Sequence, residues 1–175
     1  MQRDERAESR PTPLGAVGLG LLAGIGGTAA MTAYQEVRSR IQKSGSENGN
    51  TSEPPTWKDA PEPAQIGRRI VEGLFSREVS RDKIRVLTNA VHWGYGTACG
   101  TLYGLVQSSA RPHSALHGIV FGSAVWGSSY VMLPAMKLRK QIWEYPPKTL
   151  AADLTSHLVY GLGVAAAYRA LEKRS

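Results

Sequence analysis

Two segments of the chain carry the same pattern, in which a histidine is followed by tyrosines and small residues. The first contains His92, Tyr95, Gly96, Gly100 and Tyr103, and 65 residues further on the second contains His157, Tyr160, Gly161, Ala165 and Tyr168. Residues spaced in this way share one face of an α-helix, because eleven residues make almost three whole turns. Each segment is therefore expected to present a stripe of His, Tyr and small side chains. Imidazole can move protons or bind a metal, and phenol hydroxyls can form hydrogen bonds.

The favoured interpretation of these stripes is helix packing. Glycines recur at four-residue spacing here and elsewhere, and the predicted packing residues are Gly96, Gly100, Gly104, Gly118, Gly122 and Gly161, with Gly20 and Gly24 as a further pair. Small residues let helix backbones approach closely in a membrane, where His and Tyr add hydrogen bonds between helices. On this interpretation His92, Tyr95, Tyr103, His157, Tyr160 and Tyr168 form a polar stripe inside the membrane.

Two functional interpretations of the same stripe stay open. Polar side chains at membrane depth are costly and often mark a path for protons or solutes. The His/Tyr stripe is therefore a candidate proton relay or small-solute site. Alternatively, His92 and His157 could ligate a b-type haem, with Gly96 and Gly161 making room for the macrocycle.

Long stretches without a charged residue surround these motifs. Residues 11–35, 86–110 and 112–136 contain no Lys, Arg, Asp or Glu, and residues 154–168 form a shorter stretch of the same kind. Since a helix needs about 20 residues to cross the hydrocarbon layer, we predict an all-α fold, a four-helix transmembrane bundle. The expected spans lie near residues 14–34, 87–107, 114–134 and 151–170.

The mean hydropathy of −0.25 resembles that of a soluble protein. The expected spans, however, are rich in Gly, Ala, Ser and Thr, and the polar residues are concentrated between them. The alternative, a buried helix of a soluble bundle, needs only about 10–14 apolar residues. The fourth span is the weakest, and its terminal charges, Asp153 and Arg169, are expected to reach the headgroups at the two interfaces.

Basic residues predict the orientation. The connections at residues 35–86 and 135–150 hold ten and four Lys/Arg, whereas the N-terminal tail, the turn at 108–113 and the C-terminal end hold three, one and three. The positive-inside rule then puts both connections in the cytoplasm and both termini outside. We expect a multi-pass protein of the bacterial plasma membrane, with Trp143 and Tyr145 as interface anchors.

The segments outside the spans differ in character. Residues 1–13 are predicted to be a disordered tail, residues 14–170 a single membrane domain, and residues 171–175 a short C-terminal tail. Residues 44–64 form a flexible polar connection, too poor in apolar residues to fold alone. Apolar residues then recur at helical spacing from Ile66 to Phe75, which predicts an amphipathic helix. It lies flat at the membrane interface or, alternatively, packs on the ends of the spans.

No motif indicates catalysis. The sequence has no P-loop, HExxH, GxSxG or dinucleotide fingerprint, and its one cysteine, Cys99, is expected to be buried and inert. We predict a non-enzymatic binding or envelope-maintenance component without a cofactor; the alternatives are the transporter and the haem protein. Expected partners are the lipid bilayer and a second copy of the chain bound through glycine faces. Nucleic acid is not expected, because the net charge of +7 is concentrated between the spans.

Some of these residues resemble a known family. The run from His92 to Gly96, with Tyr103, Gly104, Gly122, Trp126 and Pro134, is similar to the YagU-like group of small bacterial inner-membrane proteins. The resemblance covers residues 14–34 and 85–170 and implies an integral plasma-membrane protein with several helices. The group has no agreed activity or cofactor, so it implies no catalytic residue. The Pro-rich connection and the charged N-terminal tail depart from its compact pattern.

Overall fold

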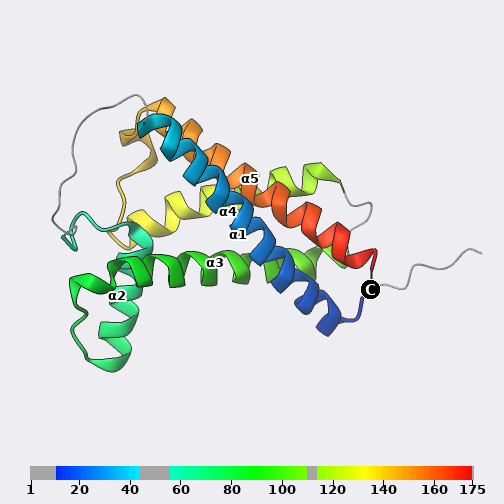
Figure 1. The fold of residues 1–175 in the computed structure, drawn as a ribbon, viewed down its shortest axis with the longest axis horizontal. Coiled ribbons are helices and arrows are strands. Elements are labelled where there is room, and N and C mark those ends of the chain that lie inside the picture. Colours follow the sequence, from blue (N-terminus) through cyan, green and yellow to red (C-terminus); the bar gives the residue numbers. More distant parts are fainter. Residues whose placement is uncertain (1–10, 44–55, 110–113, 175) are drawn as a thin grey trace, which may run out of the picture.

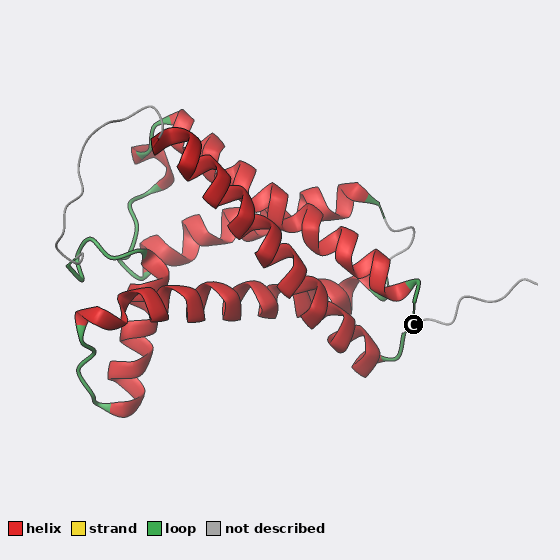
Figure 2. Cartoon of the chain, in the orientation of Figure 1, coloured by secondary structure: helices red, strands yellow, loops and turns green. Residues whose placement is uncertain are grey.

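The computed structural model describes residues 11–43, 56–109 and 114–174, and most of them lie in helices. This part of the chain forms five α-helices and two short 3₁₀ helices, and it contains no strand (Figure 1, Figure 2). In chain order they are α1 (Pro13–Lys43), α2 (Glu62–Phe75), η1 (Arg81–Lys83), α3 (Ile84–Gln107), α4 (Ala115–Ala135), η2 (Ile142–Glu144) and α5 (Pro147–Glu172). The predicted all-α fold is confirmed.

Four of the helices run between the two ends of the molecule. α1 packs against both α3 and α5, and α4 packs against α5. α1 begins near the end where α5 finishes, and the connections that contain α2 and η2 lie at the opposite end (Figure 1). The shortest of the four helices, α4, has 21 residues. It is therefore about 32 Å long, enough to cross a hydrocarbon core of about 30 Å.

Each predicted span lies within one of these helices, with differences at the ends. The largest difference is in α1, which continues beyond residue 34 to Lys43. In this extension Arg40 Nε donates to Glu36 Oε1 at 2.7 Å, one helical turn away. Such i,i+4 pairs stabilise a solvated helix modestly, so the helix does not end where its apolar stretch ends.

Three of the helices are long and apolar enough to cross a membrane. They are Pro13–Gln42, Ala115–Ala135 and Pro147–Glu172. α3 is not among them, because no stretch of 18 residues in it has a comparable mean hydropathy; Asn89, His92 and Gln107 are among its polar residues. Length and composition therefore support three spans, and a fourth span through α3 stays a prediction.

Glycines allow α1 to approach α3 at backbone distance. A Cβ atom added to Gly20 would lie 2.7 Å from the carbonyl oxygen of Gly100, and one added to Gly24 would lie 2.9 Å from that of Thr97. Real Cβ atoms do not come so close to backbone atoms, so a larger residue at either position would push the helices apart. Gly24 follows Gly20 in α1, whereas its neighbour Thr97 precedes Gly100 in α3, so the two helices are antiparallel.

The contact between α4 and α5 has the same construction. A Cβ atom on Gly118 would lie 2.7 Å from the carbonyl oxygen of Gly161 and 3.0 Å from the Cβ atom of Ala165. The 65-residue offset seen in the sequence relates Gly96 and Gly100 of α3 to these two α5 residues. The α1–α3 and α4–α5 pairs are therefore packed in a similar way, each with a small-residue face against an antiparallel neighbour.

α2 lies across the start of α3 (Figure 1). Ala60 and Ala64 form a small buried cluster with Ile84, so the end of the predicted polar connection 44–64 packs on α3; its residues 44–55 lie outside the described part. The far end of α2 differs, since Leu74 and Phe75 are 73% and 67% exposed. The first turns of α2 thus pack on the start of a predicted span, and the position of its exposed end at the membrane interface stays a prediction. Of the predicted tails, residues 1–10 and 175 also lie outside the described residues.

Candidate functional site

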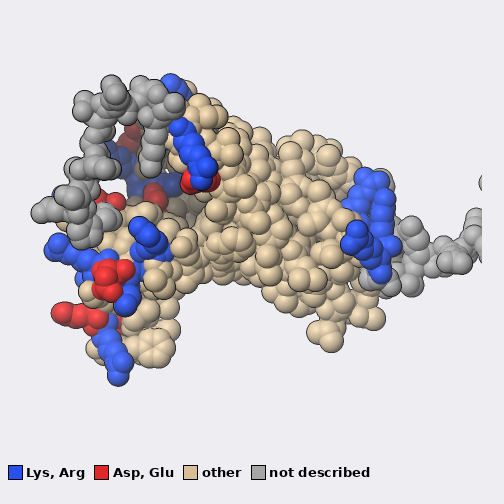
Figure 3. Space-filling model, viewed as in Figure 1, with Lys and Arg blue, Asp and Glu red and all other residues tan. Residues whose placement is uncertain are grey.

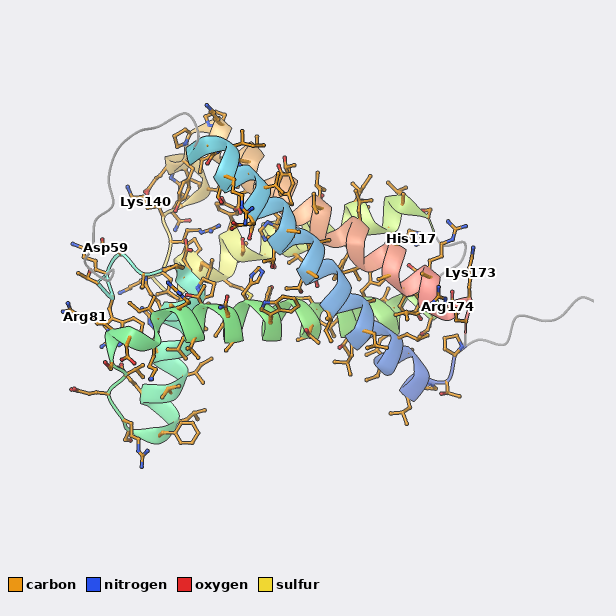
Figure 4. The ribbon with its side chains drawn as sticks, in the orientation of Figure 1. Asp59, Arg81, His117, Lys140, Lys173 and Arg174 are labelled. Carbon is orange, nitrogen blue, oxygen red and sulfur yellow. The ribbon has the colours of Figure 1, made fainter. Side chains whose placement is uncertain are left out.

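Charged residues gather at the two ends of the molecule. On the face drawn in Figure 3, a broad belt without Lys, Arg, Asp or Glu separates a mixed cluster at one end from a basic patch at the other. Figure 4 places Asp59, Arg81 and Lys140 at the mixed end and His117, Lys173 and Arg174 at the basic end. The mixed end holds the candidate site.

Arg139, in the connection between α4 and α5, is the centre of an ion cluster at the mixed end. Its Nε atom lies 3.0 Å from Glu62 Oε1 at the start of α2, and its Nη1 atom lies 3.2 Å from Asp153 Oδ2 in α5. The guanidinium also covers the ring of Tyr130 in α4, 4.8 Å from the ring centre. Only 16% of the Arg139 side chain is exposed. One partly buried cation thus joins segments far apart in the sequence.

The cluster extends along α5 through hydrogen bonds. The Tyr130 hydroxyl donates to Asp153 Oδ2 at 2.9 Å. His157 Nδ1 lies 2.9 Å from the backbone oxygen of Asp153 and 3.6 Å from its Oδ1 atom. Asp153 is turned to Arg139 and Tyr130, and 24% of its side chain is exposed. The cation and the hydroxyl donor stabilise the carboxylate, and its expected position at the headgroups stays a prediction.

Two carboxylates determine the protonation of Arg139. Burial alone lowers the pKa of Arg139, but the charges of Glu62 and Asp153, with the hydrogen bond to Glu62, outweigh burial and hold the pKa above its ordinary value. The guanidinium is therefore charged at any physiological pH. With its two carboxylate partners, the cluster carries a formal charge of −1.

A polar cavity of about 440 Å³ opens beside the cluster. Helices α1, α4 and α5, the start of α2 and the α4–α5 connection all contribute to its lining, which consists of Gln35, Arg38, Ser39, Gln42, Glu62, Tyr130, Arg139, Tyr145, Thr149, Ala152, Asp153 and Ser156. Arg38 Nη1 donates to the Ala152 carbonyl at 3.4 Å, and in the described part of the chain it forms no ion pair. The cavity therefore offers amide, hydroxyl and guanidinium groups to a ligand.

The chemistry of the lining favours hydrogen bonding over metal binding. The described residues contain no group of three or more His, Cys, Asp or Glu side chains that could hold a metal ion. The two carboxylates of the cavity are already bonded to Arg139. The donors that remain are those that recognise neutral polar or anionic small molecules.

The predicted histidines lie further from this end, on two helices that both pack against α1. His92 Nε2 lies 3.5 Å from Thr32 Oγ1 of α1. Through Asp153, His157 adjoins the ion cluster. The structure thus connects one of the two histidines, His157, to the cavity lining, whereas His92 contacts α1.

The predicted tyrosines differ in their surroundings. The Tyr160 hydroxyl donates to the Gly96 carbonyl at 2.6 Å, and Tyr168 donates to the Gly104 carbonyl at 3.4 Å. Tyr103 is also buried, with its ring centre 5.8 Å from that of Tyr168. Tyr95 is 45% exposed, and its hydroxyl lies 3.5 Å from Ser128 Oγ. The α5 tyrosines join α5 to α3, whereas Tyr95 faces α4.

Sequence reasoning did not find the ion cluster. It placed Asp153 at a membrane boundary and counted Arg139 only as a basic residue of a cytoplasmic connection. A usable signal was present, since an acidic residue at the start of a span needs a cation and the preceding connection supplies one. Glu62 could not be found in this way, because 77 residues separate it from Arg139.

These features define an all-helical protein with membrane-length apolar helices and a polar cavity at one end. Residues 43–166 match a family model described as a protein of unknown function, DUF1440. Because the match covers well over half of the chain, the protein belongs to this family. No curated protein and no solved structure matches the chain.

Proposed function

We propose that this protein spans the membrane four times and binds a small polar ligand in the cavity at its mixed-charge end, without catalysing a reaction. The observation that carries the proposal is a cavity lined by polar side chains from four helices, directly beside a charge-free belt. A site at such a boundary is open to the aqueous side and still within reach of the membrane interior.

The direction of its side chains supports α3 as the fourth span. Most of its exposed large side chains are apolar or aromatic, namely Val86, Tyr95, Leu102, Leu105 and Val106, and the exposed polar ones, Arg85 and Asn89, lie in its first two turns. Gln107 is buried and bonded to His117 of α4 at 2.9 Å, and His92 lies against α1. A helix with apolar residues outside and polar residues inside suits a lipid environment, although its average hydropathy is modest.

The interfacial features fit the same arrangement. Trp143, in η2, is 78% exposed. Leu74 and Phe75, at the end of α2, are 73% and 67% exposed. Trp side chains favour the headgroup region, and an amphipathic helix can insert its apolar side there. We place the mixed-charge end in the cytoplasm of a bacterial cell and both termini outside, in agreement with the positive-inside rule.

Binding rather than catalysis is proposed because the reactive groups of the cavity are already paired. Glu62 and Asp153 are held by Arg139. The one cysteine, Cys99, is buried in the helix core away from the cavity lining. The remaining groups can orient a ligand, but none forms a nucleophile–base pair.

Blocking the cavity rim tests this function. Thr149→Trp places a large ring at the exposed rim, whereas Lys148→Trp adds the same ring to a neighbouring exposed residue outside the lining. The protein in nanodiscs is screened by thermal unfolding against millimolar sugars, amino acids and nucleotides, since a bound ligand raises the unfolding temperature. A ligand of the cavity stabilises the natural protein and Lys148→Trp but not Thr149→Trp. Equal stabilisation of both variants, or none in the screen, contradicts the proposal.

A second candidate function is the movement of protons or small solutes along the His/Tyr stripe. The observation in its favour is the series of hydrogen bonds that leads from Tyr130 in the cavity lining to Asp153 and then to His157. Proton flux into liposomes should then fall when His92 and His157 are replaced by Gln. An unchanged flux in the double variant eliminates the relay.

Haem binding is not supported by the packing. The space beside Gly96 is filled by Thr28 of α1 and the space beside Gly161 by Gly118 and Gly122 of α4. Neither glycine leaves room for a macrocycle. We therefore attach no cofactor to the proposal.

Two further parts of the assignment remain proposals. The resemblance to the YagU-like group supports a bacterial inner-membrane location. Self-association is supported less directly, because the glycine faces expected to bind a second copy are occupied by helices of the same chain. A dimer would have to use another face, such as the exposed side of α3 around Gly94, which has no neighbouring atom within 4 Å of an added Cβ.

A further inference from the structure

A second cavity lies at the basic end, far from the proposed ligand site. Its volume is about 630 Å³, and it is bounded by the last turns of α5, the first residues of α4 and the ring of Tyr103 in α3. Three cationic side chains line it, Arg169, Lys173 and Arg174. Lys173 and Arg174 lie together at this end in Figure 4 and form part of the basic patch in Figure 3.

The other side of this cavity is apolar. Leu162, Ala165, Ala166 and Ala170 of α5 line it, in the stretch of about two and a half turns around Arg169. Leu162 is 39% exposed. One hollow thus has a cationic mouth and an apolar floor, and the floor lies within or next to the charge-free stretch 154–168.

The end of α5 carries more cations than its helix dipole explains. Cations near a helix C-terminus complement its dipole, which explains a basic residue but not three around a hollow. Glu172 lies near Tyr103 and Tyr168 and offsets one of these charges, so the surroundings keep a net positive charge. The first turn of α4 adds to it, because its N-terminal N–H groups point out of the helix and Ser114 makes no side-chain cap bond.

We infer that this cavity binds one anionic phospholipid, with its phosphate between Arg169, Lys173 and Arg174 and an acyl chain along the alanine-rich floor. The cations lie where the charge-free part of α5 ends, which is the depth of the phosphates in a bilayer. A soluble anion would use the cationic mouth alone. A lipid also uses the apolar floor, and it explains why the hollow combines both.

Lipid retention measured by native mass spectrometry tests the inference. The protein is transferred from nanodiscs of phosphatidylglycerol and phosphatidylcholine into detergent, and the bound lipids are counted. We expect one phosphatidylglycerol to be retained in preference to phosphatidylcholine. The triple variant Arg169→Gln, Lys173→Gln, Arg174→Gln should bind it at least about tenfold more weakly, since it removes all three cations that line the cavity.

Two kinds of control variant, matched in charge or in side-chain size, distinguish binding in this cavity from a general attraction of anionic lipid to basic residues. Arg77→Gln, Arg81→Gln, Lys140→Gln removes three exposed cations at the opposite end and should keep the retained lipid. Ala166→Trp fills the apolar floor without a change of charge and should lose it, whereas Ala98→Trp, on the exposed side of α3, should not.

Three results would overturn the inference. These are equal retention of both lipids, equal loss in the two triple variants, and normal retention in Ala166→Trp. A last experiment compares the unfolding temperature in millimolar inorganic phosphate with that in phosphatidylglycerol. If phosphate raises it as much as the lipid does, the site binds a free anion and not a lipid. Because the Thr149→Trp experiment concerns the other cavity, either proposal can fail alone.

Discussion

At the scale of single residues, Arg139 joins parts of the chain that no backbone hydrogen bond connects. Its guanidinium bonds Glu62 of α2 and Asp153 of α5 and covers Tyr130 of α4. Removing one member of a partly buried ion cluster is costly mainly because it leaves the other charges without a partner. Arg139 is therefore one of the contacts that hold α2 at the mixed-charge end, beside the hydrogen bond from Arg69 Nη1 to the Met136 carbonyl and the packing of α2 on α3.

Arg139→Met should lower the free energy of unfolding by about 2 kcal/mol, because two half-buried carboxylates lose their cation. Thermal unfolding of the protein in detergent measures the change. The control is Arg40→Met, whose pair with Glu36 is exposed at both side chains and is worth less than about 0.5 kcal/mol. Equal effects of the two substitutions would show that the cluster contributes no more than a surface pair.

Glu72 gives the turn after α2 a dependence on pH. The hydrogen bond from Arg68 and that from the Val79 N–H hold the pKa of Glu72 below its ordinary value of 4.5. A carboxylate with a lowered pKa contributes its full stabilisation above the ordinary value, and the stabilisation is lost as the pH falls through the lowered pKa.

The amide proton of Val79 reports this titration directly, since the N–H donates to Glu72 Oε1 at 3.2 Å. Its NMR chemical shift should titrate with a midpoint below pH 4.5 in the natural protein, and Glu72→Gln should abolish the titration. A midpoint at or above pH 4.5 would mean that these bonds do not form in solution.

At the scale of the helices, the sequence predicts the features that a local pattern determines, which are the positions of the helices and their small-residue faces. Charge-free stretches locate all four long helices, because each stretch is continuous along the chain. Four-residue glycine spacing also marks faces, such as Gly20 and Gly24, that meet a neighbouring backbone. It does not tell which helix is the neighbour, since any small-residue face accepts any other. The expectation of a second copy of the chain arose from this ambiguity.

The ion cluster and the cavity lay beyond prediction for a different reason. They exist because the α4–α5 connection folds back over α2, and Glu62 and Arg139 are brought together only by that path. No periodicity in either segment encodes the meeting. The amphipathic pattern of α2 likewise predicted an apolar side, but not that Gly67 would pack on Leu87 while Leu74 and Phe75 stay exposed.

Gly100→Val tests the close approach of α1 and α3. An added Cβ would meet the Gly24 backbone and lie 2.8 Å from the Gly20 carbonyl oxygen, so the helices must separate. We expect unfolding to become easier by about 2 kcal/mol, as for other overpacked cores. Gly94→Val, six residues earlier on the same helix, has no atom within 4 Å of the added Cβ and should be tolerated. Similar unfolding temperatures for the two variants would contradict the packing.

At the scale of the whole molecule, two glycine-packed pairs form one bundle through contacts that are not equivalent. α1 packs on α5 through Gly27 and Gly163, where an added Cβ on Gly163 would lie 3.1 Å from the Gly27 Cα. On the other side α3 and α4 meet through side chains, with the rings of Tyr103 and Phe121 5.0 Å apart. The internal similarity therefore does not give the bundle two equal halves, and the cavity described at the basic end has a different lining from the polar cavity.

The topology depends on whether α3 crosses the membrane. If it does, the turn between α3 and α4 lies on the opposite side from α2. Ser109, at the end of α3, and Arg81, before its start, are both exposed. They are suitable sites for a single cysteine once the only native one is removed by Cys99→Ala.

In intact spheroplasts a membrane-impermeant maleimide should label Ser109→Cys and leave Arg81→Cys unlabelled until the membrane is opened, since α3 then separates the two residues by the full bilayer. Lys140→Cys should behave like Arg81→Cys, and Lys173→Cys like Ser109→Cys. If Ser109→Cys and Arg81→Cys were labelled alike, α3 would lie on one side of the bilayer, and the mixed-charge end and the basic end could not face opposite compartments.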